Sequence, residues 1–187
     1  MNVPFRNSLL VVGLIAAAAL SRLLPHPANV SPVAALALLG GATLPLPWSV
    51  ALPAAAMLLS DIFLGFDSIP VTLSVYGSFF ATVALGRWLK ARPSPVRLIA
   101  ASLGSSVLFY LVTNAAVWQF SGLYPRTPDG LVLSYLFALP FFRHSLLGDL
   151  AYTVGLFLAL ETSPQWVRAV RRVAFAPGAF RRSASTP

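Results

Sequence analysis

Long apolar blocks alternate along the chain with short polar connections that are rich in proline. The blocks cover residues 8–24, 32–44, 50–64, 71–89, 98–118 and 144–160. A helix needs about 20 mostly apolar residues to cross the hydrocarbon core of a bilayer, and four of these blocks approach or reach that length. The pattern therefore predicts an all-α fold, an integral membrane bundle of about six transmembrane helices.

Three parts of this pattern are less regular than the rest. The blocks at residues 32–44 and 50–64 are short, which fits a thin or tilted hairpin as well as partly re-entrant segments. Residues 45–49, with two prolines and Trp48, predict a tight turn at the membrane interface. Residues 131–142 are apolar but contain a proline, which predicts a short separate helix at the membrane edge before the last span.

The composition places the chain among membrane proteins. Of its 187 residues, 57% are hydrophobic and 10% are charged, whereas soluble domains carry about 25% charged residues. We expect residues 1–187 to form one membrane domain with a basic cytoplasmic tail at 165–187. The first block could also be a signal peptide, but its apolar pattern recurs downstream, so a retained span is the simpler interpretation. The chain has no cysteine, which excludes disulfides and thiolate metal sites.

Positive charges are distributed unevenly between the two predicted sides of the membrane. Ten of the thirteen Lys and Arg residues fall on one side, namely Arg6, Arg87, Lys90, Arg92, Arg97, Arg168, Arg171, Arg172, Arg181 and Arg182. Arg22, Arg126 and Arg143 fall on the other side. Because cytoplasmic flanks are enriched in Lys and Arg, we expect a bacterial inner-membrane protein with both termini in the cytoplasm. This placement accounts for the net charge of +8, so we expect no nucleic acid partner.

Polar and ionisable residues gather at the outer ends of the predicted helices. An ionisable group inside a span costs about 3 kcal/mol on insertion scales, so it usually faces a cavity or a charged partner. Aromatic residues accompany these groups, as in small-molecule pockets that have apolar walls and a few polar contacts. The candidate substrate-binding residues are Arg22, His26, Asn29, Asp61, Tyr76, Asn114, Trp118, Arg143 and Asp149.

Several of these residues also have simpler interpretations. Arg22 could extend toward lipid headgroups, and Asp61 could pair with Arg22 or cap a neighbouring helix. His26 lies between two prolines and could be a solvated turn residue. Arg143 and Asp149 lie at the start of one predicted helix, where an internal ion pair or interfacial anchoring explains them as well as a ligand site does.

Motifs for catalysis and metal binding are missing from the sequence. It contains no HExxH, no GxSxG and no Walker A sequence. His144 and Asp149 are too poorly spaced for one face of a helix. We therefore expect a protein that is not an enzyme and that carries no metal and no cofactor.

Small residues form smooth surfaces on the first two predicted helices. They are Gly13, Ala16, Ala17, Ala18, Ala19, Ala34, Ala37, Gly40 and Gly41. Such surfaces let helices approach each other closely. Packing inside the protein and a sliding contact with another membrane subunit both explain them.

The segments at residues 22–41, 60–66, 118–124 and 139–157 together carry a resemblance to a known group. The first overlaps the run Ser21-Arg22-Leu23-Leu24-Pro25-His26-Pro27-Ala28-Asn29, and the last contains Gly148-Asp149-Leu150. With six predicted spans, the chain resembles the substrate-binding (S) components of energy-coupling-factor vitamin transporters. It is most similar to an S-component-like family of transport proteins.

This resemblance implies an S-component-like membrane bundle with an outward-facing pocket, built by the first, third and fifth loops and the outer helix ends. It implies uptake of a small vitamin-like metabolite, with an energy-coupling transmembrane subunit and ATPases as partners or without them. A cobalamin transporter among the solitary relatives characteristically uses a cysteine as a cobalt ligand. This chain has none, which argues against cobalamin unless His26 replaces that ligand.

Two other classes remain open at the level of sequence. Membrane scaffold proteins of the rod-shape-determining type have a similar size and number of spans, but they do not require buried acids at the outer ends. An integral-membrane enzyme would require a catalytic constellation, and the sequence shows no such motif.

Overall fold

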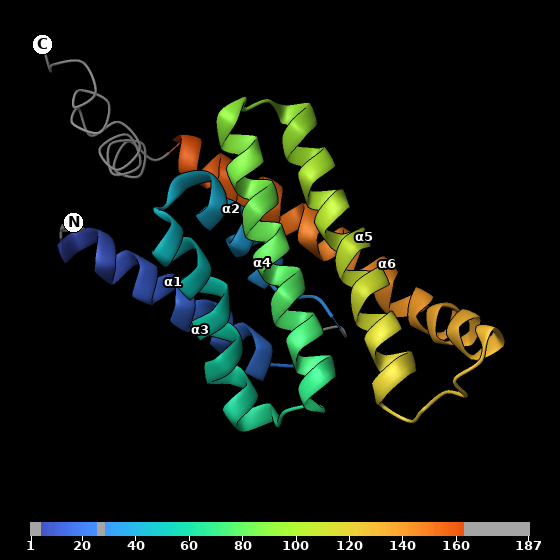
Figure 1. Cartoon of the computed structure of the whole chain (residues 1–187). Coiled ribbons are helices and arrows are strands. Elements are labelled where there is room, and N and C mark those ends of the chain that lie inside the picture. The colour runs from blue at the N-terminus through green and yellow to red at the C-terminus, as the bar shows by residue number, and fades with distance from the viewer. Residues whose placement is uncertain (1–4, 26–28, 163–187) are drawn as a thin grey trace, which may run out of the picture.

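The computed structural model describes residues 5–25 and 29–162, so the predicted basic tail at 165–187 lies outside the described residues. The described part folds into α-helices, which confirms the predicted all-α class (Figure 1). The helices are α1 (Phe5–Leu23), α2 (Val33–Thr43), α3 (Leu46–Leu64), α4 (Ile69–Ala91), α5 (Pro95–Phe120) and α6 (Pro128–Thr162).

Four of these helices, α3 to α6, are long and apolar enough to cross a membrane. They indicate a membrane-embedded protein. The apolar part of α1 and the whole of α2 are shorter. With 11 residues, α2 is about 16 Å long, roughly half the thickness of a hydrocarbon core. The predicted six spans are therefore supported for four helices of the described chain.

The prediction of a five-residue turn at 45–49 is wrong, because α3 already begins at Leu46. Pro47 lies in the first helical turn, where a missing backbone N–H costs no hydrogen bond and the fixed φ of proline suits the helix. The turn is thus reduced to Leu44 and Pro45. This earlier start lengthens α3 to 19 residues.

The prediction of a separate helix at 131–142 is also wrong. Residues on both sides of Pro140 belong to one continuous helix of 35 residues. A proline removes one backbone hydrogen bond, which interrupts helices in water. In membrane helices an internal proline is tolerated, because neighbouring helices, Ser and Thr side chains or local helix adjustments satisfy the freed backbone groups. The position of Pro140 therefore does not mark a helix boundary here.

The helices are arranged around α2. Figure 1 shows α4 and α5 side by side, α6 crossing obliquely behind them, and α2 behind α4. Nine of the eleven residues of α2 are buried, and its Val33, Leu36 and Leu39 form the centre of the core. The core also takes in Leu52 and Met57 of α3. A helix that is apolar on all sides is thus enclosed by protein.

Small residues let α2 and α4 pack at close range. A Cβ atom on Gly41 would lie 3.1 Å from the Cα of Gly86 and would collide with the carbonyl oxygen of Val83. A Cβ on Gly86 would collide with the carbonyl oxygen of Leu38. These glycines therefore serve internal packing. On α1, by contrast, Ala18 is buried whereas Gly13, Ala16 and Ala17 are exposed.

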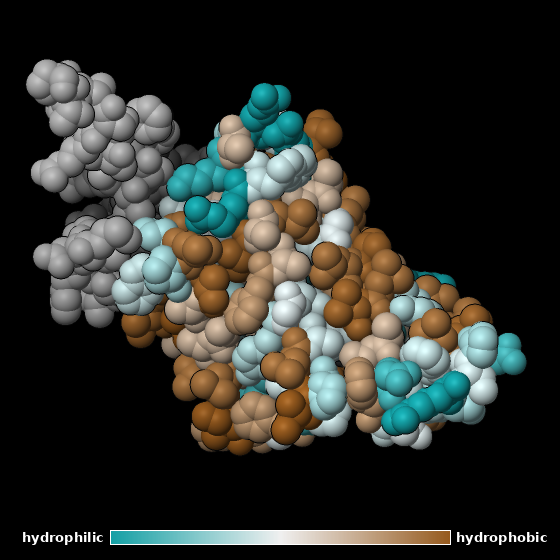
Figure 2. Space-filling view, in the orientation of Figure 1, coloured by the Kyte–Doolittle hydropathy of each residue, from teal (hydrophilic) through white to brown (hydrophobic). Residues whose placement is uncertain are grey.

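The connections between the helices lie at the two ends of the bundle. The α2–α3 and α4–α5 turns lie at the upper end in Figure 1, and the α3–α4 and α5–α6 connections lie at the lower end. Figure 2 shows hydrophilic residues over the α4–α5 turn and the α5–α6 loop, with mostly hydrophobic residues over the helices between them. This distribution suits a protein whose sides face lipid.

Candidate functional site

A cavity of about 590 Å³ lies among the helices, and residues from all six of them line it. Its volume falls in the range of about 300–1,000 Å³ typical of small-molecule sites. The polar lining residues are Arg22, Asn29, Ser31, Asp67, Ser106, Tyr110, Thr113, Asn114, Ser145 and Asp149. Aromatic and aliphatic side chains fill the spaces between them, among them Phe79, Phe109, Phe141 and Phe142.

An ion pair joins the ends of α1 and α3 at this cavity. The Nη1 atom of Arg22 donates to Oδ1 of Asp61 across 2.7 Å, and it also donates to the hydroxyl of Ser60. The Tyr76 hydroxyl on α4 donates to Oδ2 of Asp61 across 3.0 Å. Asp61 is 7% exposed, and its two oxygens thus bind a cation and a phenol from two other helices. Pairing with Arg22, one of the alternatives for Asp61, is present.

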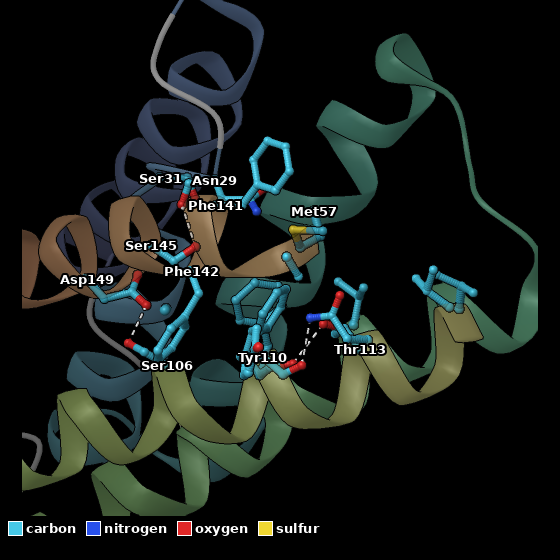
Figure 3. A pocket seen from close by; sticks show the side chains of 18 of the residues that line it. Asn29, Ser31, Met57, Ser106, Tyr110, Thr113, Phe141, Phe142, Ser145 and Asp149 are labelled. Carbon is cyan, nitrogen blue, oxygen red and sulfur yellow. Dashed lines mark hydrogen bonds between the residues drawn. The ribbon is translucent and has the colours of Figure 1, made fainter. Parts of the chain in front are cut away.

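A second buried carboxylate lines the cavity from another helix. Asp149 on α6 is 8% exposed, and its Oδ2 accepts a hydrogen bond of 2.7 Å from the hydroxyl of Ser106 on α5. Figure 3 shows this pair at the cavity beside the ring of Phe142. Among the described residues, Arg22–Asp61 is the one ion pair within 4.0 Å, so Asp149 has no cationic partner there.

The second oxygen of Asp149 has no hydrogen-bond donor among the described residues. The printed bond from Ser106 goes to Oδ2, and within those residues no fully buried side-chain oxygen or nitrogen lacks a partner. Asp149 itself lines the cavity. The carboxylate can accept at least one more hydrogen bond from whatever occupies the space.

The long helix α5 supplies the middle wall. The ring of Tyr110 lies 4.5 Å from that of Phe142 between centroids, and its hydroxyl donates to the backbone carbonyl of Tyr135 across 2.7 Å. One turn further, the amide nitrogen of Asn114 donates to the carbonyl of Tyr110 across 2.8 Å. This fixes the Asn114 side chain, and no hydrogen bond from the described residues goes to its amide oxygen, which can accept one from a ligand.

Four of the nine candidate residues from the sequence line the cavity: Arg22, Asn29, Asn114 and Asp149. Asp61 and Tyr76 lie behind Arg22 and hold it. Trp118 and Arg143 do not line the cavity. The indole of Trp118 donates to the carbonyl of Pro125 across 2.9 Å, which fixes the α5–α6 loop, and Arg143 is exposed. His26 lies outside the described residues.

Ser106 is the main contributor that the sequence interpretation missed. A signal for it was present, because Ser102 and Ser106 have the spacing of one helical face, as do Asp149 and Thr153. The structure pairs the two faces: Ser106 bonds Asp149, and Ser102 donates to the Thr153 hydroxyl across 3.3 Å. Matching polar spacings on two apolar helices could therefore have predicted their contact.

Within the described residues, no three His, Cys, Asp or Glu side chains are close enough to hold a metal ion. The cavity offers hydrogen-bonding groups and, in Asp149, a buried carboxylate without an ion pair among the described residues, surrounded by apolar and aromatic walls. Such an arrangement can hold and orient a small molecule.

Comparisons with known proteins give a family and nothing closer. No curated protein and no solved structure matches the chain significantly. The profile of the family described as "Family of unknown function (DUF6580)" matches residues 4–171, so the chain belongs to that family.

Proposed function

We propose that this protein captures a small, vitamin-like metabolite in its cavity from the outer side of a bacterial inner membrane and carries it inward without altering it. The observation that supports this most is the cavity itself, since all six helices contribute to it and two buried carboxylates lie on it or directly behind its wall. Buried ionisable groups are costly in a membrane and usually mark a pathway or a ligand site. A scaffold has no need of them.

The charge distribution supports an outward-facing cavity. The α4–α5 turn, at the end of α4 away from the cavity, carries Arg87, Lys90, Arg92 and Arg97. Since Lys and Arg accumulate on the cytoplasmic side, this turn belongs in the cytoplasm and the cavity lies toward the opposite face. Both termini are then cytoplasmic.

The outer face of α1 supports a contact with a second membrane subunit. Gly13, Ala16 and Ala17 are exposed, and a Cβ atom on Gly13 would meet nothing within 4 Å. Small exposed residues allow another helix to approach closely in a membrane. An energy-coupling transmembrane subunit with its ATPases would fit there, and uptake without such a module is the other form of the proposal.

Equilibrium binding of a panel of radiolabelled vitamins and precursors to the purified protein tests the proposal. The panel includes flavins, cobalamin, cobinamide and queuosine precursors. Ala138→Phe places a ring in the cavity wall and should abolish binding. Val112→Phe adds the same ring on α5 at a position that is exposed and does not line the cavity, and it should bind normally.

If no compound binds to the folded protein, and deletion of the gene alters cell shape without changing uptake, the protein is a scaffold and the proposal is wrong. Uptake that persists in cells lacking every energy-coupling ATPase would instead support the solitary form.

A further inference from the structure

We infer that the ligand of this cavity carries a positively charged nitrogen that binds the Asp149 carboxylate. This inference rests on the proposed function, because it specifies the chemistry of the captured metabolite. The nitrogen belongs to a protonated amine or to a cationic heteroaromatic ring.

The first argument is the balance of charge around the cavity. Its charged lining residues, within the described chain, are Arg22, Asp67 and Asp149. The charge of Arg22 is neutralised by Asp61 at 2.7 Å, and Asp67 is exposed to solvent at the rim. Asp149 is left as a buried charge without a counter-charge. A cation in the cavity removes that imbalance, whereas an anion increases it.

The second argument is the geometry of the Asp149 carboxylate. Ser106 occupies Oδ2 with a bond of 2.7 Å, which holds the carboxylate in one orientation. Oδ1 has no partner among the described residues, and Asp149 lines the cavity. A fixed carboxylate with one free oxygen is suited to accept a charge-assisted hydrogen bond from an N–H donor.

The third argument is the aromatic wall next to this carboxylate. Phe142 and Tyr110 pack against each other with ring centroids 4.5 Å apart, and both line the cavity with Phe109. Figure 3 shows Phe142 beside the Ser106–Asp149 pair. Because aromatic faces attract cations and planar rings, they favour a ligand in which the charged nitrogen is part of, or attached to, a ring.

The dimensions of the site limit the rest of the ligand. Ser106, which marks the position of Asp149, and Asn114, which offers an amide oxygen, are both on α5. Eight residues separate them, a distance of about 12 Å at the helical rise of 1.5 Å per residue. A ligand with a cationic group at one end and a neutral polar group at the other contacts both if it spans roughly 6–12 Å, because each hydrogen bond covers about 3 Å of the separation.

Two sets of compounds that share a ring and differ in charge test this inference. The first set is pyridoxamine, pyridoxine and 4-pyridoxate, and the second is 3-(aminomethyl)pyridine, 3-(hydroxymethyl)pyridine and nicotinate. Binding of each to the purified protein in detergent is measured by isothermal titration and by thermal shift, beside the wider vitamin panel. We expect the tightest binders in the whole panel to be cations, and in each set the cation to bind at least tenfold more tightly than the anion.

The variant Asp149→Asn keeps the shape of the side chain and its bond to Ser106 but removes the charge. It should weaken binding of the cationic ligands at least tenfold and leave neutral ones within about threefold. Asp129→Asn is the matched control, because it removes the same charge from an exposed position on the same helix. It should leave every affinity unchanged.

The outcomes separate this inference from the proposed function. If neutral or anionic compounds bind best, or if Asp149→Asn binds cations as tightly as the natural protein, the inference is overturned while ligand capture stands. An acid that serves only to bind a proton would give that second result. If no compound of any charge binds to protein shown to be folded, both the inference and the proposed function are contradicted.

Discussion

Asp61 Oδ1 lies 2.7 Å from Arg22 Nη1, and this contact ties the last turn of α1 to the last turn of α3. Two residues separated by most of two helices and a proline-rich connection thus form one unit at the cavity. Tyr76 extends the unit to α4 through the other carboxylate oxygen. The predictions below begin with this unit.

Asp61→Leu should destabilise the protein by about 3 kcal/mol, because it leaves the guanidinium of Arg22 without its counter-charge in a mostly buried place. Reversible unfolding in mixed detergent micelles would measure the loss. The double variant Arg22→Met with Asp61→Leu removes both charges and should recover at least half of it. Equal stability of the single variant and the natural protein would show that the pair contributes nothing.

Ser106→Ala should lower the free energy of unfolding by about 1–3 kcal/mol, because it removes the hydrogen-bond donor to a buried carboxylate. Ser105→Ala is the comparison of choice. Ser105 is also buried on α5, but its hydroxyl bonds only the backbone of its own helix, at the Ser102 carbonyl. In detergent, the Tm of Ser106→Ala should be well below that of Ser105→Ala. The opposite order would show that the Asp149 contact does not stabilise the fold.

Gly86→Ala should destabilise the fold by about 1–3 kcal/mol, since the added methyl collides with the Leu38 backbone where α2 and α4 touch and the helices must separate. On the same helix, a Cβ atom at Gly77 would meet nothing within 4 Å. Gly77→Ala should therefore be neutral or slightly stabilising. The same unfolding measurement distinguishes these two cases, and equal losses would argue against close packing as the cause.

A cysteine at Ser121 should react with a membrane-impermeant maleimide in intact spheroplasts, because the α5–α6 loop is expected outside. A cysteine at Ala91, by the basic α4–α5 turn, should react only after permeabilisation. The natural chain has no cysteine, so every label reports the introduced site. The reverse pattern would invert the proposed orientation of the cavity.

The periodicity of the sequence was sufficient to predict helices and their approximate positions, because apolar block length is a direct consequence of the thickness of a bilayer. The positions of the charged residues were also sufficient to name Arg22 and Asp61 as a candidate pair, since an ionisable group in a span needs a partner. Both predictions depend on the free-energy cost of placing a polar or charged residue in the hydrocarbon core. That cost can be judged for each residue from the sequence alone.

Helix boundaries at proline could not be predicted in the same way. Pro47 begins a helix because it lies in the first helical turn, where proline is tolerated, whereas Pro140 lies inside a helix, where only the surroundings decide whether the helix continues. The partner of Asp149 was missed for a different reason. Serine is common on membrane helices, and Ser106 differs from Ser105 only in the direction that it faces once α5 and α6 are packed.

The enclosure of α2 has a consequence for how the molecule is made. A segment of about 16 Å cannot bridge a bilayer by itself, and its side chains meet neighbouring helices on nearly every side. It therefore lacks most of its packing partners in the membrane until α4 and α6, which follow it in the chain, have inserted. We therefore expect the innermost helix, although it is synthesised second, to reach its final position only after the later helices have inserted.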